Sequence, residues 1–223
     1  MRDLRLEKKF VFGKNREFFL NKFLLTNYFK KLHPSRKINS IYLDTLNYNF
    51  IKDNIDGISD RKKIRFRWYN NNIENIFFEI KKKKNFVVLK TIQKIEKISE
   101  NNFIDGLNDH LILNRINEYN YNFVLKVSYD RSYWISPDKK FRATIDTNIN
   151  ASSIKNENMT ISLPDTILEF KLIPAHEISF RNFIRPRSNS LRVQKYSKYV
   201  RSFIALEEAG RFNHLKKLNF KRI

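Results

Sequence analysis

The chain has 223 residues, of which 41% are hydrophobic and 14% aromatic, so we expect a sizeable packed core and exclude disorder as its main state. Lys and Arg outnumber Asp and Glu by 44 to 23, and the net charge of +21 indicates a polyanionic partner: nucleic acid, an anionic membrane surface or a phosphate-rich molecule. The sequence contains no cysteine, which excludes disulfides, Cys-zinc sites and thiol nucleophiles.

The start of the chain and its apolar stretches predict a cytoplasmic protein. Residues 1–6 carry charge with no apolar run behind them, so we expect no signal peptide. No stretch approaches the roughly 18 apolar residues that a membrane-spanning helix needs. A membrane partner and the oligomeric state are both left open by the sequence.

Alternating side chains predict a first strand over residues 4–12. A helix over residues 16–32, which His33-Pro34 ends, is predicted by the spacing of the apolar residues Phe18, Phe19, Phe23, Leu24 and Tyr28. Further strands are expected at residues 38–45, 60–70, 73–83, 86–90, 125–134, 141–148 and 167–172.

Helical segments are expected at residues 46–54, at residues 99–119 and from Pro174 onward, with an interruption at residues 185–187. The Asn-rich stretch 148–159 is predicted to be an exposed connection. No repeat, low-complexity tract or linker divides the chain, so residues 1–223 are predicted to form a single α+β domain.

Charged residues recur at every second position of these strands, which places them on one face because strand side chains alternate. That face collects Glu7 and Lys9; Arg65 and Arg67; Glu79, Lys81 and Lys83; Tyr129 and Arg131; Arg142, Thr144 and Asp146; and Glu169 and Lys171. The opposite face collects Phe66 and Trp68; Phe78 and Ile80; Ala143 and Ile145; and Leu168, Phe170 and Leu172.

Two geometries agree with this pattern. In an open sheet, the apolar face packs on helices and the charged face meets solvent. In a closed barrel, the charged face lines the lumen, where an excess of Lys and Arg requires an anion of high charge density. The few carboxylates among the cations then indicate a divalent metal on that anion, because Mg²⁺ and Mn²⁺ take oxygen ligands.

Eight short motifs follow one another along the chain: LEKKF (6–10), INSIYLDT (38–45), RKKIRFRWY (61–69), FEIKKK (78–83), VSYDRSYW (127–134), FRATIDT (141–147), LEFKL (168–172) and YSKY (196–199). Their order resembles the VTC domain, the polyphosphate polymerase branch of the triphosphate tunnel metalloenzyme (CYTH-like) superfamily. RFRWY and YSKY are the most distinctive of these motifs.

This resemblance implies a closed antiparallel eight-stranded β-barrel, the triphosphate tunnel, with flanking helices. It also implies a phosphotransferase that moves the γ-phosphoryl of ATP onto a growing polyphosphate chain. The implied cofactor is Mn²⁺ (or Mg²⁺), and the implied partners are ATP and inorganic polyphosphate or triphosphate.

The resemblance also carries over site residues, motif by motif. The basic residues expected to hold phosphates and support catalysis are Lys9, Arg65, Arg67, Lys81, Arg131, Arg142 and Lys198. Looser matches expected to bind phosphate are Lys83, Lys90, Tyr129 and Ser197. Glu169 matches the acidic residue of the metal site, and Glu79 and Glu7 are further candidate metal ligands.

The first motif departs from the related CYTH-type triphosphatases, which begin with Glu-x-Glu-x-Lys. Arg5 stands at the position of the first carboxylate here, which favours the polymerase branch over a thiamine-triphosphatase-like enzyme. Two alternatives stay open: a tunnel triphosphatase that hydrolyses inorganic or nucleoside triphosphate, and a non-catalytic polyphosphate-binding module.

A specific nucleic-acid partner is not expected, because such a binder has no need of Glu79 and Glu169 in register with the cations. The basic residues Arg181, Arg185, Arg187 and Arg192 precede YSKY. They are interpreted either as a funnel for anions or as an exposed helix face, and the sequence does not decide between the two.

Overall fold

A computed structural model describes residues 5–84, 87–95, 98, 103–113, 121–154, 159–187 and 191–210 of the chain. Contacts between residues divide it into two compact units. Unit 1 comprises Met1–Lys37, Tyr129–Ile149 and Ser162–Ser197, and unit 2 comprises Ile38–Ser128, Asn150–Ile161 and Lys198–Ile223.

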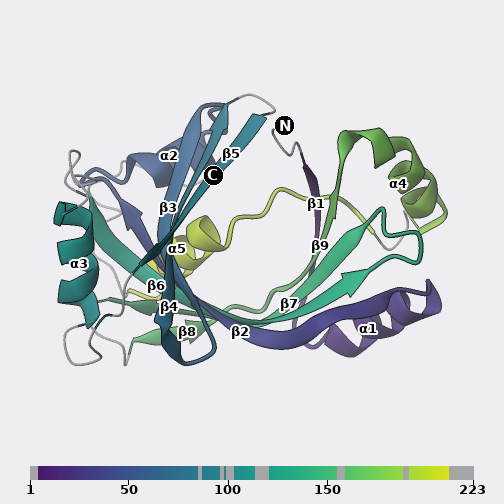
Figure 1. Cartoon of the computed structure of the whole chain (residues 1–223), viewed down its shortest axis with the longest axis horizontal. Coiled ribbons are helices and arrows are strands. Elements are labelled where there is room, and N and C mark those ends of the chain that lie inside the picture. Colours follow the sequence, from purple (N-terminus) through teal and green to yellow (C-terminus); the bar gives the residue numbers. More distant parts are fainter. Residues whose placement is uncertain are drawn as a thin grey trace. The chain divides into compact units, whose positions relative to one another are not determined.

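An antiparallel sheet and short helices make up the chain, as the predicted α+β class requires (Figure 1). The strands are β1 (Leu6–Phe12), β2 (Lys30–Asp44), β3 (Arg61–Tyr69), β4 (Asn72–Lys84), β5 (Val87–Ile95), β6 (Asn122–Ile135), β7 (Arg142–Ser153), β8 (Thr160–Ser162) and β9 (Thr166–Leu172). The helices are α1 (Glu17–Thr26), α2 (Asn49–Ile55), α3 (Phe103–Leu113), α4 (Glu177–Ile184) and α5 (Lys198–Glu208), with 3₁₀ turns η3 (Pro174–His176) and η4 (Arg185–Arg187).

The strands are hydrogen-bonded in the order β1-β9-β7-β6-β2-β3-β4-β5, and β8 pairs with β7. Within the described ranges, this order begins at β1 and ends at β5 without a pairing between those two strands. Closure of the sheet into a barrel, which the family resemblance implies, therefore stays a prediction.

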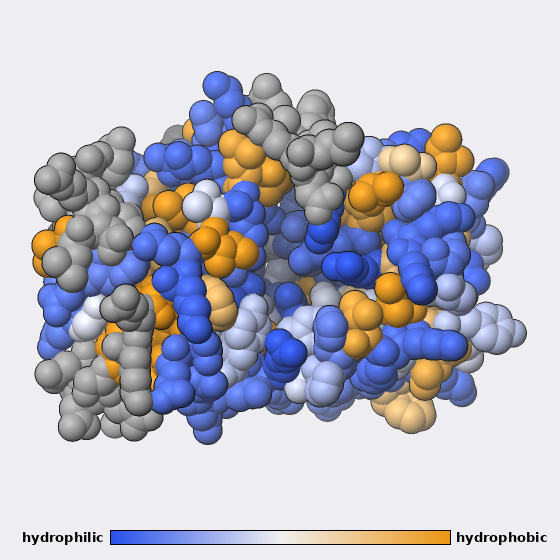
Figure 2. Space-filling model, in the orientation of Figure 1, coloured by the Kyte–Doolittle hydropathy of each residue, from blue (hydrophilic) through white to orange (hydrophobic). Residues whose placement is uncertain are grey.

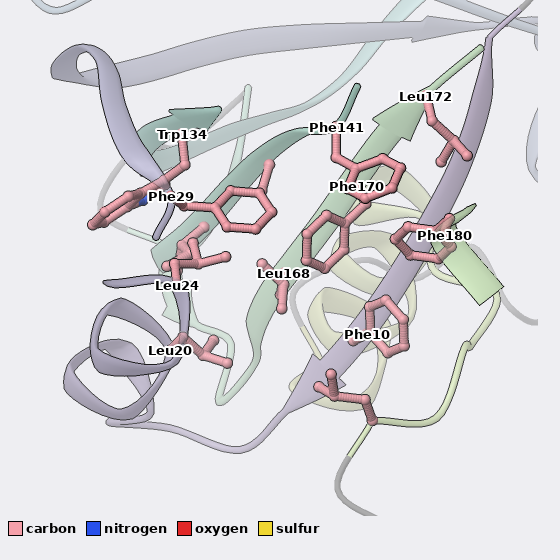
Figure 3. Close-up of a cluster of buried hydrophobic side chains, with 13 residues drawn as sticks. Phe10, Leu20, Leu24, Phe29, Trp134, Phe141, Leu168, Phe170, Leu172 and Phe180 are labelled. Carbon is pink, nitrogen blue, oxygen red and sulfur yellow. The ribbon is translucent and has the colours of Figure 1, made fainter. Parts of the chain in front are cut away.

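The core of unit 1 lies between its strands and the helices α1 and α4. Figure 3 shows Leu168 and Phe170 of β9 between Leu20 and Leu24 of α1 on one side and Phe10 of β1 on the other. The rings of Phe10 and Phe170 meet edge to face at 6.0 Å between centroids, a favourable aromatic geometry. Apolar residues at every second strand position thus bury one face of the sheet beneath helices.

The core of unit 2 follows the same rule with α3 as its cover. Phe66 and Phe78 on neighbouring strands bring their rings to 5.0 Å, and Leu107 of α3 packs into the same buried cluster. Gly106 lets the helix approach closely, because a Cβ at that position would collide with the side chain of Ile98. The helix therefore needs a residue without a side chain at this point.

The strand registers confirm the predicted separation of faces. Arg65 lies opposite Glu79 in the β3–β4 pair, and Lys9 lies opposite Glu169 in the β1–β9 pair. Phe66 lies opposite Phe78 on the other face. Charged and apolar side chains therefore lie on opposite faces of these strands, as the sequence predicts.

The predicted helix over residues 16–32 is wrong in its second half. Helix α1 ends at Thr26, and β2 begins already at Lys30 rather than at residue 38. Tyr28 adopts a left-handed conformation with φ 61°, its N–H bonds to the carbonyl of Leu25, and the N–H of Phe29 bonds to that of Leu24. This Schellman arrangement stops the helix, and the packing of Phe29 against Leu24 fixes the turn.

The predicted exposed connection over residues 148–159 is also wrong in part. Strand β7 continues to Ser153, and Ala151, Ser152 and Ser153 are buried. Residues 155–158 of that stretch lie outside the described residues, as do parts of the helix predicted at 99–119 and the first residue of the strand predicted at 86–90.

Hydrophilic residues cover most of the face shown in Figure 2, with hydrophobic residues in smaller groups between them. Among the helices of the described ranges, none has both the length and the apolar character needed to cross a membrane.

Candidate functional site

Unit 2 carries a charged strand face centred on Arg65. The Nε and Nη2 of this arginine both donate to Oε2 of Glu79, at 2.8 Å and 2.6 Å. Its Nη1 donates to the hydroxyl of Tyr42 at 3.2 Å. Three fixed contacts from two neighbouring strands therefore orient one guanidinium group.

Glu79 is the hub of this face. Besides Arg65, the Nζ of Lys90 donates to its Oε1 at 2.9 Å, and Nη1 of Arg67 lies 3.8 Å from its Oε2. Burial by itself would raise the pKa of Glu79, but Arg65, Arg67 and Lys90 together outweigh burial and hold that pKa well below its usual range. One carboxylate thus stands among three cations, and the cluster keeps an excess of positive charge.

Lys81 and Lys83 extend the row of cations along β4. The register places Lys81 opposite Lys63 and Lys90, and Lys83 opposite Arg61. Both side chains are half-buried. Like charges facing one another across strands repel, so this region favours an anion that can neutralise it.

Unit 1 carries a second charged face, in which Arg131 and Asp146 form a two-point ion pair. The Nε and Nη2 of Arg131 donate to the two carboxylate oxygens of Asp146, at 2.5 Å and 2.7 Å. Asp146 has no exposed surface. Burial would lower the pKa of Arg131, but Asp146 and Tyr129 raise it well above its usual value, so Arg131 stays charged. The guanidinium carbon lies 5.2 Å from the ring centre of Tyr129.

Glu169 stands at the centre of the β1, β9 and β7 strands of this face. Lys171 lies 3.2 Å from its Oε1 and Lys9 lies 3.7 Å from its Oε2. Lys9 also donates to the backbone carbonyl of Tyr196 at 3.0 Å. Glu169 itself is buried, so this carboxylate is again held by more than one cation.

Arg142 and Glu7 lie at the exposed margin of the same face. Both are opposite Lys171 in the register, Arg142 on β7 and Glu7 on β1. Thr144 lies opposite Glu169, is 8% exposed, and its hydroxyl has no hydrogen-bond partner within the described part of the chain. A buried donor of this kind suits a phosphate oxygen.

Lys198 and Ser197 stand where α5 begins, and both are half-buried. The next residue anchors the helix: the hydroxyl of Tyr199 donates to Oδ2 of Asp44 at 2.9 Å, and its ring stacks on Tyr42 at 4.6 Å. Since Tyr42 also contacts Arg65, the helix that bears Lys198 is fixed to the strand that orients this arginine.

Asp44 is itself a buried junction. Its carboxylate accepts hydrogen bonds from the backbone N–H groups of Thr45, Phe50 and Ile51, which hold the start of α2. Burial nevertheless raises the pKa of Asp44 to about 6. These contacts give Asp44 a structural role, in which it joins the start of α2 to Tyr199 of α5.

Sequence reasoning missed two members of these faces as site residues. Lys171 and Thr144 share the alternation and could have been selected by it. Tyr199 belongs to the YSKY motif, but its contact with Asp44, 155 positions away, had no sequence signal. Arg187 of the basic group before YSKY contacts Asn27 at 2.6 Å and is a structural residue, whereas Arg181 and Arg192 are exposed.

The carboxylates of the two charged faces limit how a divalent metal could bind. The described residues contain no group of three or more His, Asp or Glu side chains that could hold a metal by themselves. Glu79 and Asp146 are each held by arginine, whereas Glu169, with Glu7 diagonally across β1 and β9, offers one or two carboxylates. This set fits Mg²⁺ or Mn²⁺ only where phosphate oxygens supply the remaining ligands, which is their usual mode of binding.

Comparisons with solved structures show the fold. A candidate adenylate cyclase from Bacillus halodurans matches with a TM-score of 0.56 and 14% identity, over 88% of this chain and 97% of that one. A protein from Pyrococcus horikoshii matches with a TM-score of 0.53 and 18% identity, over 91% and 99%. A candidate adenylyl cyclase from Hippeastrum, described as having a dominant triphosphatase activity, matches with a TM-score of 0.55 and 10% identity, over 92% and 96%.

A comparison with curated proteins gives no match. The VTC domain family model matches residues 5–206, which include every motif that carried the resemblance and both charged faces. The chain therefore belongs to the VTC domain family.

Proposed function

We propose that this chain is a metal-dependent polyphosphate polymerase, which transfers the γ-phosphoryl group of ATP to a growing inorganic polyphosphate chain. The observation that carries the proposal is the pair of charged strand faces, in which Glu79 and Glu169 are each held by more than one cation. Membership of the VTC domain family supports the choice of a phosphate chain as the anion.

The proposal includes closure of the sheet into the eight-stranded tunnel, within a single domain of residues 1–223. Both charged faces would then act on one phosphate chain. An experimental structure with inorganic tripolyphosphate tests this part, since it must place Arg65, Arg142 and Glu169 around one ligand.

Phosphoryl transfer asks the protein mainly to position its substrates and to neutralise charge. Arg65 and Arg67 present guanidinium forks that can bind two phosphate oxygens at once, and Lys81 and Lys90 add point charges beside them. In unit 1, Arg142 and Lys9 would play the same parts. Lys83, Lys198, Ser197 and Tyr129 are assigned to phosphate binding.

In the proposed step, a terminal oxygen of the polyphosphate attacks the γ-phosphorus of ATP. The bond between that phosphorus and the oxygen bridging to the β-phosphate breaks, and ADP leaves with the electron pair. The attacking phosphate is ionised near neutral pH, so the reaction requires no general base. Glu169, with Glu7, would hold the Mn²⁺ or Mg²⁺, which supplies charge neutralisation on the phosphates when it is bound.

The test incubates the purified protein with ATP and Mn²⁺ and measures acid-labile polymer against free phosphate. We expect polymer, and we expect Arg142→Ala to lower turnover by about 10²–10³. Arg142 is exposed, so its removal leaves no buried carboxylate unpaired. The control is Lys140→Ala, which removes an exposed cation from the turn before β7 and should leave turnover unchanged. Normal synthesis by Arg142→Ala contradicts its assignment.

A tunnel triphosphatase is the second candidate, favoured by the triphosphatase activity named for the Hippeastrum structure. Release of phosphate without polymer in the same assay would select it. Binding of tripolyphosphate without either product would select a non-catalytic polyphosphate-binding module.

A further inference from the structure

Helix α1 is apolar on its outer side as well as on its inner side. Leu20 and Leu24 point into the core of unit 1, as Figure 3 shows. On the outer side, Phe18 is 80% exposed and Leu25 is 59% exposed. A surface helix is expected to be polar on the side that faces water, so the outer side of α1 is suited to a partner.

The exposed residues form one stripe. Phe18, Lys22 and Leu25 are spaced by four and then three positions, which brings their side chains together on one helix face. Tyr28, 78% exposed, follows in the turn after the helix. Figure 2 shows hydrophobic residues at the surface in the region of α1, next to hydrophilic ones.

The charges around this stripe decide what kind of partner fits. Residues 14–31 contain five cations and one acid, Glu17. Lys14, Arg16, Lys22 and Lys30 are exposed, and Lys22 lies within the apolar stripe itself. Apolar side chains bordered by Lys and Arg match an anionic lipid surface, where the rings enter the interface and the cations meet the head groups.

The position of α1 in unit 1 leaves the charged face accessible. The helix packs against Leu168 and Phe170, whereas Glu169 between them points to the opposite face of the strand. A surface that covers α1 therefore does not cover Glu169 or its lysines.

We propose that the outer face of α1, formed by Phe18, Lys22, Leu25 and Tyr28, docks on an anionic membrane surface. The apolar side chains insert at the level of the head groups, and Lys14, Arg16 and Lys22 contact the lipid phosphates and carboxylates. The site is separate from the phosphate-binding residues, so this proposal stands independently of the proposed reaction.

The test is co-sedimentation with phosphatidylcholine vesicles, prepared with and without phosphatidylserine. Any strongly basic protein binds anionic vesicles to some degree, so the comparison between variants carries the result. We expect Phe18→Ser/Leu25→Ser to reduce binding to the anionic vesicles at least about tenfold, because two apolar side chains are lost from the interface. The matched control is Leu46→Ser/Ile112→Ser, which removes two exposed apolar residues of unit 2 and should bind as the unaltered protein does.

Equal binding by the two double variants would overturn the proposal, since it would show attraction by net charge alone. A dimer in solution that Phe18→Ser/Leu25→Ser dissociates would also overturn it, since a second copy would then cover the stripe. If the double variant does not fold, Lys22→Glu replaces it: the charge reversal must weaken binding to anionic vesicles more than Lys140→Glu does.

Discussion

Replacement of Glu79 by Gln tests whether the charged face of unit 2 depends on a counter-ion. The change removes the carboxylate that Arg65, Arg67 and Lys90 share. Breaking a buried ion pair costs about 3–5 kcal/mol. Lys90 and Arg65 keep part of their solvent contact, which lowers the expected loss to about 2–4 kcal/mol. For a chain of this size, the melting temperature should fall by about 5–15 °C.

Thermal unfolding of the purified variants gives this measurement, with Glu74→Gln as the control. Glu74 is exposed on the same strand, so it matches the change in net charge without touching the cluster. Its effect should stay within about 0.5 kcal/mol. Equal melting temperatures for the two variants would refute the counter-ion role of Glu79.

The stabilising effect of Glu79 should also depend on pH, in a direction that its pKa determines. The pKa of Glu79 is held below its usual range in the folded protein, so its stabilising effect is present above the unfolded value near 4.5 and is lost as the pH falls toward the folded value. The gap in stability between the unaltered protein and Glu79→Gln should therefore narrow in acid. A gap that widens in acid would contradict the depressed pKa.

Inorganic tripolyphosphate separates the two roles considered for Glu79. If Glu79 is a counter-ion, Glu79→Gln leaves the three cations without a competing carboxylate. Tripolyphosphate should then raise the melting temperature of the variant more than that of the unaltered protein. If Glu79 is a metal ligand, as the sequence suggested, the variant should bind tripolyphosphate more weakly than the unaltered protein only when Mn²⁺ is present.

Three further predictions concern Arg131, Thr144 and Asp44. Arg131→Ala should destabilise the fold by about 3–5 kcal/mol, because it leaves Asp146 buried without its partner, and chemical denaturation measures this loss. Thr144→Val should preserve stability within about 1 kcal/mol yet weaken tripolyphosphate binding in titration calorimetry, and unchanged binding would exclude its hydroxyl from the site. The pKa of Asp44 is raised from 3.8 to about 6, so the folded state binds the proton of this carboxyl more tightly than the unfolded state does. The free energy of unfolding of the unaltered protein, compared with that of Asp44→Asn, should therefore fall by about 3 kcal/mol from acid to neutral pH. Chemical denaturation of the two proteins at acid and at neutral pH measures this difference.

The division of each strand into a charged and an apolar face could be predicted because it depends on local geometry alone. Strand side chains alternate wherever the strand lies, so Arg65 and Glu79 were placed correctly without knowledge of their neighbours. The pairing partners could not be predicted in this way. That Lys90 contacts Glu79 and Lys171 contacts Glu169 depends on register and rotamer, which the sheet as a whole decides.

The errors in the predicted element boundaries have two origins, strand pairing and a local turn. The start of β2 is polar, contains Pro34 and shows no clean alternation, and only its place beside β6 makes it a strand. The left-handed turn at Tyr28, which ends α1, uses a residue whose sequence signal for that conformation is weak. Ala151 to Ser153 are buried although the Asn-rich sequence around them indicates exposure. In β2 and β7, tertiary pairing overrides local preference, whereas the turn at Tyr28 is made by local backbone hydrogen bonds.

The carboxylates of the two faces also bear on how an anion would bind. A row of half-buried Lys and Arg without counter-ions would repel itself, and its side chains would turn toward solvent. Glu79 holds the Arg65 fork in place by two hydrogen bonds, and Glu169 keeps Lys9 and Lys171 within 4 Å. An incoming phosphate chain would therefore meet cations that are already ordered, and the loss of side-chain entropy on binding would be small. The same carboxylates would repel the phosphate chain, so they would lower its affinity while they keep the cations ordered. A divalent metal bound at Glu169 would relieve this repulsion in unit 1.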